Sequence, residues 1–168
     1  MKKLLVCAAI AVFGMSSVFA QEFNVGLSAA LPMGDAGDFT TFGVNLDANY
    51  LWDVSDDFKA GVTTGYHHYF GDEVTTSVFG TSLTLEFDDF GFLPIAAAGR
   101  YNVSEVLTVG ADLGYAVGLS PDGNEGGVYY APKIQYSVSD KIDIVAAYKG
   151  ISNDGSFDSV SLGVEFGL

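Results

Sequence analysis

The stretch VGADLGYAVG, residues 109–118, places glycines at positions 110, 114 and 118 and an aspartate at position 112. Glycines spaced four residues apart are typical of helices that pack closely in membranes. From 107 to 119, however, the odd positions carry Leu, Val, Ala, Leu, Tyr, Val and Leu, whereas Thr, Gly, Asp and Ala occupy the even positions. A period of two is that of a β-strand. The glycines and Asp112 therefore share one face of a predicted strand.

The same alternation recurs in further segments, which lie at 23–31, 44–52, 58–66, 93–101, 128–138, 142–149 and 160–168. Together with 107–119, they predict eight strands. Short connections lie at 53–57, around 104–105 and at 139–141, and they alternate with longer ones at 32–41, 71–91, 120–127 and around 152–156. Short turns on one side and long loops on the other are typical of outer-membrane barrels.

The distribution of bulk between the two faces separates a membrane barrel from a soluble one. A soluble eight-stranded barrel or sandwich needs bulky apolar side chains inside. Here the face that carries charges is built mainly from Gly, Ala, Ser and Thr, and the other face from Leu, Val, Ile and Tyr. Small residues fit the narrow interior of such a barrel, so the bulky face is left to meet lipid. We expect an all-β fold, an eight-stranded antiparallel up-and-down transmembrane β-barrel.

The first twenty residues have the order of a secretory signal peptide. Basic residues at 2–3 precede an apolar run at 4–13 and the small-residue cleavage pattern at 18–20. We expect cleavage after Ala20, so that residues 1–20 are a signal peptide and residues 21–168 form a single outer-membrane barrel domain. The only cysteine, Cys7, leaves with the signal, and the mature chain then has no disulfide and no thiolate metal site.

The composition excludes two classes of protein. The formal net charge is −14 at pH 7. The chain therefore lacks the basic surface that nucleic acid binding requires. Disorder, which also goes with high net charge, needs few core-forming residues, whereas 49% of this chain is hydrophobic and 14% is aromatic. The mean hydropathy of +0.30 without a long apolar run in the mature part suits apolar residues at alternate positions.

Ions of both signs fall on the small-residue face and predict a charge network in the lumen. Its members are Asp47, Lys59, Arg100, Asp112, Lys133, Asp143, Lys149 and Glu165. Buried charges need partners of opposite sign. We expect Arg100 and Glu165 on the turn side and Lys133 near Asp112 and Asp47. The alternative is that several of these ions simply face water.

Aromatic residues group at two levels, as rings do at the two interfaces of a bilayer. The turn-side group is Phe23, Tyr50, Trp52, Phe58, Tyr101, Tyr136 and Phe166, and the loop-side group is Phe42, Tyr66, Phe70, Phe92, Tyr115, Tyr130, Tyr148 and Phe157. We expect the aromatic girdle to consist principally of Tyr50, Trp52, Tyr101, Tyr115, Tyr130, Tyr136, Tyr148 and Phe166.

The segment FLPIAAAGRYNVSEVLTVGADLGYAVGL (92–119), the pattern VFA before Gln21 and the final strand SVSLGVEFGL (159–168) resemble the small outer-membrane β-barrel proteins of the "porin family", or OmpX-like proteins. The resemblance covers the mature chain. It implies insertion by the barrel-assembly machinery, which recognises the last strand. Many such proteins end in Phe, whereas this chain ends in Leu168 and keeps the apolar alternation of Val164 and Phe166.

Candidate chemistry is sparse. His67 and His68 are the only histidines and point to opposite faces of a strand, so they form no compact site by themselves, and we expect both near the loop-side rim. A lipid hydrolase would need a serine and an acid beside a histidine, and the sequence has no local signature for one. Segment 81–87 alternates again, which predicts either a protruding hairpin or irregular loop. We expect no catalytic role, no cofactor and no structural metal.

The longer loops are rich in acidic residues and have no Lys or Arg. Divalent cations are a possible partner for them, although soluble turns with Asp-Gly pairs explain the same composition. We expect a monomer in the bacterial outer membrane, in contact with its lipids, with a structural or surface-interaction role and a lumen filled by side chains. A narrow passive porin is the alternative, and a secreted soluble barrel that binds a small apolar ligand is a remote one.

Overall fold

A computed structural model describes residues 21–78 and 81–168 of the protein. The expected signal peptide, residues 1–20, lies outside the described residues. The elements in chain order are β1 (Gln21–Met33), the 3₁₀ helix η1 (Gly34–Asp38), β2 (Thr40–Asp53), β3 (Phe58–Gly71), β4 (Glu73–Val78), β5 (Thr81–Glu86), β6 (Phe90–Asn102), β7 (Leu107–Ser120), β8 (Gly127–Ser139), β9 (Ile142–Ser152) and β10 (Ser156–Gly167).

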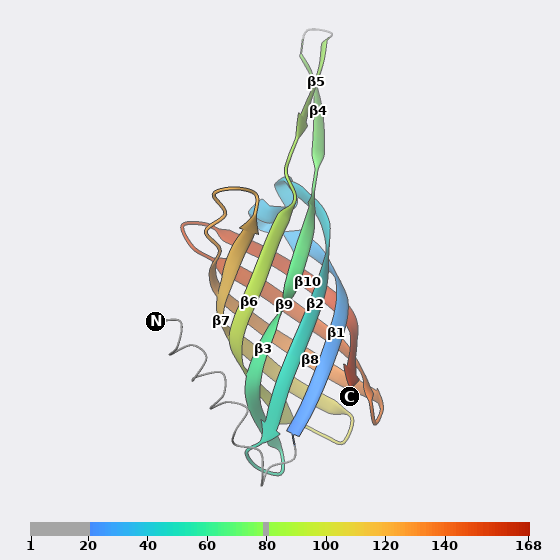
Figure 1. Ribbon diagram of the computed structural model, residues 1–168. Helices are drawn as coiled ribbons and strands as arrows, with labels where there is room; N and C mark the ends of the chain where they lie inside the picture. Colours follow the sequence, from blue (N-terminus) through green and yellow to red (C-terminus); the bar gives the residue numbers. More distant parts are fainter. Residues whose placement is uncertain (1–20, 79–80) are drawn as a thin grey trace, which may run out of the picture.

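Eight of these strands close into an antiparallel barrel in the order β1-β10-β9-β8-β7-β6-β3-β2 (Figure 1). The first and last strands pair directly, with Asn24 opposite Gly167, so the sheet has no free edge. The predicted up-and-down transmembrane barrel fold is confirmed, and each predicted strand is present. Several strands run further toward the loops than the alternation indicated, as β2 and β3 do. The described part of the chain contains no helix with the length and apolar character of a membrane span.

The connection between β3 and β6 forms a second, two-stranded sheet. β4 pairs with β5 from Glu73 opposite Glu86 to Val78 opposite Thr81. This hairpin projects well beyond the rim of the barrel (Figure 1). Of the two structures that the sequence allowed for this segment, the protruding hairpin is the one observed. Its base is tied to the barrel because the Gly71 amide donates to Asp89 Oδ1 at 2.9 Å.

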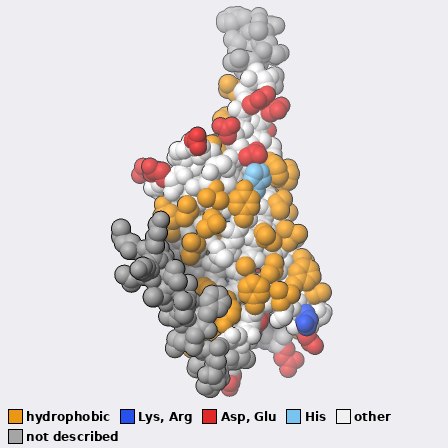
Figure 2. Space-filling view, in the orientation of Figure 1, with side chains coloured by type: hydrophobic (Ala, Val, Ile, Leu, Met, Phe, Trp, Pro, Cys, Tyr) orange, Lys and Arg blue, Asp and Glu red, His pale blue; other side chains and the backbone are white. Residues whose placement is uncertain are grey.

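The barrel is inverted relative to a soluble protein. Leu113 and Leu162 are 64% and 62% exposed on the outside, whereas Asp112 is 2% exposed inside. Apolar side chains form patches over the visible barrel wall, and acidic side chains lie at its two ends and near the base of the hairpin (Figure 2). A broad apolar wall with charged ends is the surface that a bilayer requires of a barrel.

The loop-side half of the lumen holds an aromatic layer, formed by Tyr69, Tyr129, Phe92 and Phe157 and flanked by Phe39 and Phe90. The ring of Phe157 lies 4.7 Å from that of Tyr69 and 5.1 Å from that of Phe92, measured between centroids. The expectation that Phe92 and Phe157 belong to the outer belt is therefore wrong. Each shares the parity of inward residues on its own strand, Arg100 on β6 and Glu165 on β10, so each must point inward.

Replacing Leu162 by Arg places a charge in the middle of the outward apolar face. We expect it to lower the free energy of unfolding by about 2–4 kcal/mol in lipid vesicles, as measured by denaturant titration. Leu85→Arg is the matched control, because Leu85 is 53% exposed on the protruding hairpin. Equal losses in the two variants would contradict a lipid-facing wall.

Candidate functional site

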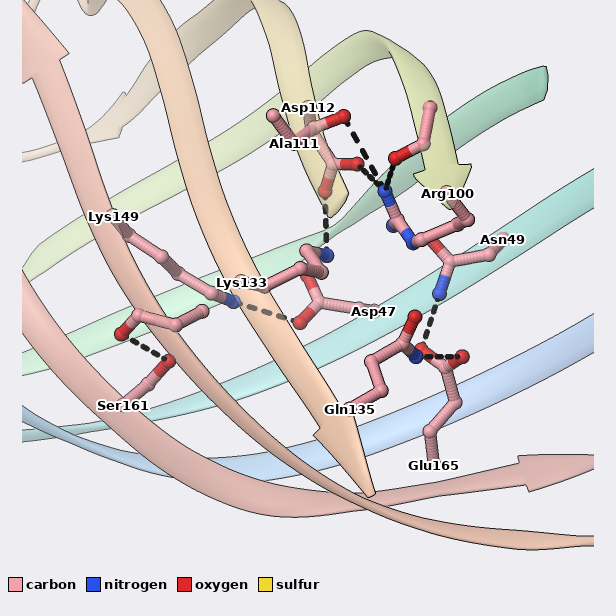
Figure 3. A network of polar contacts seen from close by, with 12 residues as sticks. Asp47, Asn49, Arg100, Ala111, Asp112, Lys133, Gln135, Lys149, Ser161 and Glu165 are labelled. Carbon is pink, nitrogen blue, oxygen red and sulfur yellow. Dashed lines mark hydrogen bonds and ion pairs between the residues drawn. The ribbon is translucent and has the colours of Figure 1, made fainter. Parts of the chain in front are cut away.

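The lumen is the candidate site, and it has three levels. The aromatic layer fills the loop-side end, where η1 lies over it with Ala36 fully buried. A polar network with several buried ions crosses the middle (Figure 3). A cavity of about 900 Å³ lies at the turn end, lined by Lys59, Arg100, Asp143 and Glu165 among others. The lumen is thus closed by side chains at two levels and hollow at the third.

Asp112 on β7 is the centre of the first ionic cluster. Arg100 Nη1 donates to its Oδ1 at 2.7 Å, and Lys133 Nζ lies 2.6 Å from its Oδ2. All three side chains are at least 94% buried. Arg100 Nη1 also donates to the Gly99 carbonyl at 2.9 Å. Two cations therefore share one carboxylate in an environment from which solvent is excluded.

Gly110 makes the bond between Arg100 and Asp112 possible. Arg100 lies opposite Gly110 in the pairing of β6 with β7. A Cβ atom at position 110 would lie 2.5 Å from Arg100 Cδ and 2.7 Å from the Gly99 carbonyl oxygen. Because Gly110 has no side chain, the long side chain of Arg100 can pass over this position. Gly110 is one of the glycines that the alternating pattern places on the lumenal face.

The second ionic cluster joins β2, β3 and β9. Lys149 Nζ donates to Asp47 Oδ2 at 2.7 Å, and His67 Nε2 lies 2.8 Å from Asp47 Oδ1 and 3.1 Å from Lys149 Nζ. His67 is fully buried, with its ring 5.8 Å from that of Tyr129. The predicted network did not include His67, and its expected place at the rim is wrong. Its parity with Lys59 on β3 was the signal that could have placed it in the lumen.

Glu165 on β10 is held by neutral groups. Asn49 Nδ2 donates to its Oε2 at 2.6 Å, and Gln135 Nε2 donates to its Oε1 at 3.0 Å (Figure 3). Gly26, opposite Glu165 on β1, presents no side chain between them. The carboxylate therefore reaches across β1 to an amide on β2.

The predicted charge network is brought together in part. The structure places all of its members on the lumenal face and puts Lys133 beside Asp112, whereas Arg100 binds Asp112 and forms no ion pair with Glu165. Lys59 pairs with Glu22 at the turn end, and Asp143 lines the cavity there. Arg100 pairs with Asp112 because the two residues lie on adjacent strands, β6 and β7.

The predicted girdle residues lie on the outward face. Tyr101, Tyr115, Tyr136, Tyr148 and Phe166 are exposed, and Tyr50, Trp52 and Tyr130 are half-buried. Their partial burial comes from neighbouring rings: Tyr50 lies 6.3 Å from Trp52, and Tyr130 lies 6.3 Å from Tyr148. These rings occupy the positions that interfacial aromatic residues take in membrane barrels.

The two histidines lie in separate environments. His67 is sealed inside the lumen, and His68 points outward, where its Nε2 lies 3.2 Å from Asp89 Oδ2 and its Nδ1 lies 3.2 Å from the Tyr66 hydroxyl. Within residues 21–78 and 81–168, no group of three or more His, Cys, Asp or Glu side chains is arranged to hold a metal ion. What the lumenal arrangement does supply is a set of buried ion pairs and packed rings across the lumen.

Comparison with solved structures shows which proteins share this architecture. Ail, the attachment invasion locus protein of Yersinia pestis, superposes with a TM-score of 0.55 at 15% identity over 88% of this chain and 97% of that one. The chain has the fold of the small outer-membrane barrels. Neisserial surface protein A gives a TM-score of 0.50 at 15% identity, covering 89% of this chain and 99% of its own.

A de novo designed transmembrane β-barrel gives a TM-score of 0.53 at 15% identity, covering 88% of this chain and 95% of the design. No protein-family model matches the sequence, and no curated protein matches it. The shared fold therefore identifies an architecture, and the properties of the site rest on the side chains described above.

Replacing Asp112 by Asn leaves Arg100 and Lys133 buried without a carboxylate. We expect a loss of about 3–5 kcal/mol in the free energy of unfolding, measured by denaturant titration in detergent micelles. Lys59→Met is the control, because the Lys59–Glu22 pair is partly exposed and its loss costs about 1 kcal/mol or less. Equal effects would show that the Asp112 cluster is not a desolvated one.

Proposed function

We propose that this protein is an integral protein of the bacterial outer membrane without a catalytic role, whose barrel is closed and whose β4–β5 hairpin and acidic loops carry a surface-interaction role. The observation that carries the proposal is the combination of a plugged lumen with a sheet that projects from the loop side. A barrel that cannot conduct has its chemistry at its rim. The outward apolar wall favours a membrane protein over a secreted barrel with an apolar ligand.

The closure of the lumen favours a structural barrel over a narrow porin. A solute that enters from the loop side meets the aromatic layer of Tyr69, Phe92 and Phe157 first. It then meets the ion pairs of Asp47 and Asp112, which are bonded across the lumen to Lys149 and Lys133. Eight strands enclose little space, and buried side chains occupy it at these two levels.

The hairpin is suited to binding another protein through its backbone. β4 and β5 form a sheet of their own, so each has an outer edge that a partner strand can extend by β-augmentation. Its base is surrounded by Asp72, Asp88 and Asp89, and like charges discourage pairing between identical copies. The protein is therefore proposed to act as a monomer.

The charge of the loops limits which partners can bind them. They carry acidic residues and no Lys or Arg. Ail has been solved in complex with the heparin analogue sucrose octasulfate. A sulfated ligand of that kind would be repelled here, so the proposed partner is a neutral or cationic protein surface. Divalent cations at the loops, outer-membrane lipids around the wall and the barrel-assembly machinery during insertion complete the proposed partners.

Planar-bilayer recording tests the closed lumen. We expect no steady conductance from the wild-type protein. We also expect none from Phe157→Ala, because the ionic level beneath the aromatic layer stays in place. Steady channels from the wild-type protein would favour the narrow passive pore instead.

Shortening the hairpin tests the surface role. The Phe87 amide donates to the Asp72 carbonyl at 2.9 Å, so a two-residue Asn-Gly turn can replace residues 73–86. We expect the shortened protein to stay in the outer-membrane fraction with unfolding free energy within about 0.5 kcal/mol of wild type. Cells that display it should lose adhesion to neutral and polycation-coated surfaces. Unchanged adhesion would contradict a role for the hairpin.

A further inference from the structure

Two carboxylates lie opposite each other on the wall of the turn-side cavity. Glu165 on β10 lies directly opposite Asp143 on β9, and both line the cavity. Like charges in opposed positions of neighbouring strands destabilise a sheet. Within the described residues, neither carboxylate forms an ion pair, and Glu165 is only 4% exposed. The wall of the cavity therefore carries two negative charges that no cation among the described residues neutralises by contact.

Amide oxygens complete this arrangement. Asn24 and Asn49 lie opposite each other on β1 and β2, are 2% and 0% exposed, and each has an Oδ1 atom without a hydrogen-bond partner. Asn24 lines the same cavity. Asn49 donates its Nδ2 to Glu165, which keeps its own oxygen close to that carboxylate. Carboxylate and amide oxygens are the ligands of hard divalent cations.

The cations of the lumen are already engaged elsewhere. Arg100 and Lys133, which act on Glu165 electrostatically at longer range, both bond to Asp112. Lys59, at the mouth of the cavity, pairs with Glu22. Satisfying Glu165 and Asp143 with Arg100, Lys133 or Lys59 would break one of these pairs, whereas a cation from solution would not.

We propose that Glu165 and Asp143, with the amide oxygens of Asn24 and Asn49, form a binding site for a divalent cation, Ca²⁺ or Mg²⁺, at the turn end of the lumen. The four residues lie on β9, β10, β1 and β2, which are consecutive around the barrel. A cation held there links the strands on either side of the pairing between β1 and β10. The site stabilises the closure of the barrel and is independent of the surface role.

The test uses the full barrel in detergent micelles, stripped of metal with a chelator that is then removed by dialysis. Calorimetric titration with Ca²⁺ or Mg²⁺ alone should give one more bound cation for the wild-type protein than for Asp143→Asn. We expect the variant to weaken binding at this site about tenfold or more, because affinity depends on the number of charged ligands. Asp140→Asn is the control, since Asp140 is an exposed residue at the mouth of the same cavity.

Thermal unfolding gives an independent readout. The difference in unfolding midpoint between the variant and the wild type should have opposite signs in chelator and in Ca²⁺. In chelator, Asp143→Asn should raise the unfolding midpoint, because it removes the repulsion from Glu165. In the same concentration of Ca²⁺ the wild-type midpoint should rise by more than that of the variant, because the weaker site stabilises the folded state less. Glu165→Gln should behave in the same way, which keeps the test available if one variant fails to fold. Identical titrations for wild type and Asp143→Asn, or an equal loss in Asp140→Asn, would overturn the site.

Discussion

The narrow interior of an eight-stranded barrel is the constraint from which the other features follow. The cylinder has no room for two faces of bulky side chains, so bulk goes to the outside and small residues go to the inside. Long ionic side chains can then enter the lumen where a small residue leaves space on the neighbouring strand, as Gly110 does for Arg100 and Ser159 does for Lys149. Once inside and desolvated, each ion needs a partner. In the middle of the lumen, Asp112 and Asp47 are the carboxylate partners of the buried cations.

Much of this arrangement could be predicted from the sequence, because strand parity assigns a face to every residue. Parity placed Asp112, Lys133 and Lys149 in the lumen, and applied consistently it would also have placed His67 and Phe157 there. The predictions that fail are those that rest on residue type rather than on parity. Phenylalanine near a strand end suggested a membrane interface, and the histidine near a loop suggested a rim.

The sequence predicts less well which charged side chains pair with each other inside the lumen. Lys149 on β9 binds Asp47 on β2, and these strands are not neighbours in the sheet. Such a contact depends on how deeply each residue lies along a tilted strand, which the alternating pattern does not encode. Arg100 illustrates the same point: charge alone made Glu165 an acceptable partner, whereas adjacency of β6 and β7 selected Asp112. The hairpin, too, was one of two structures that its alternation allowed.

The lumen is hollow at the turn end and closed toward the loops, and this asymmetry determines where the permeability barrier lies. Since the cavity is open to the turn-side compartment, small solutes from that side can pass part of the way through the membrane plane. If the barrel is closed as proposed, a concentration or electrical gradient across the membrane falls over the aromatic and ionic levels alone, so these two levels form a thinner insulating partition than the full height of the barrel.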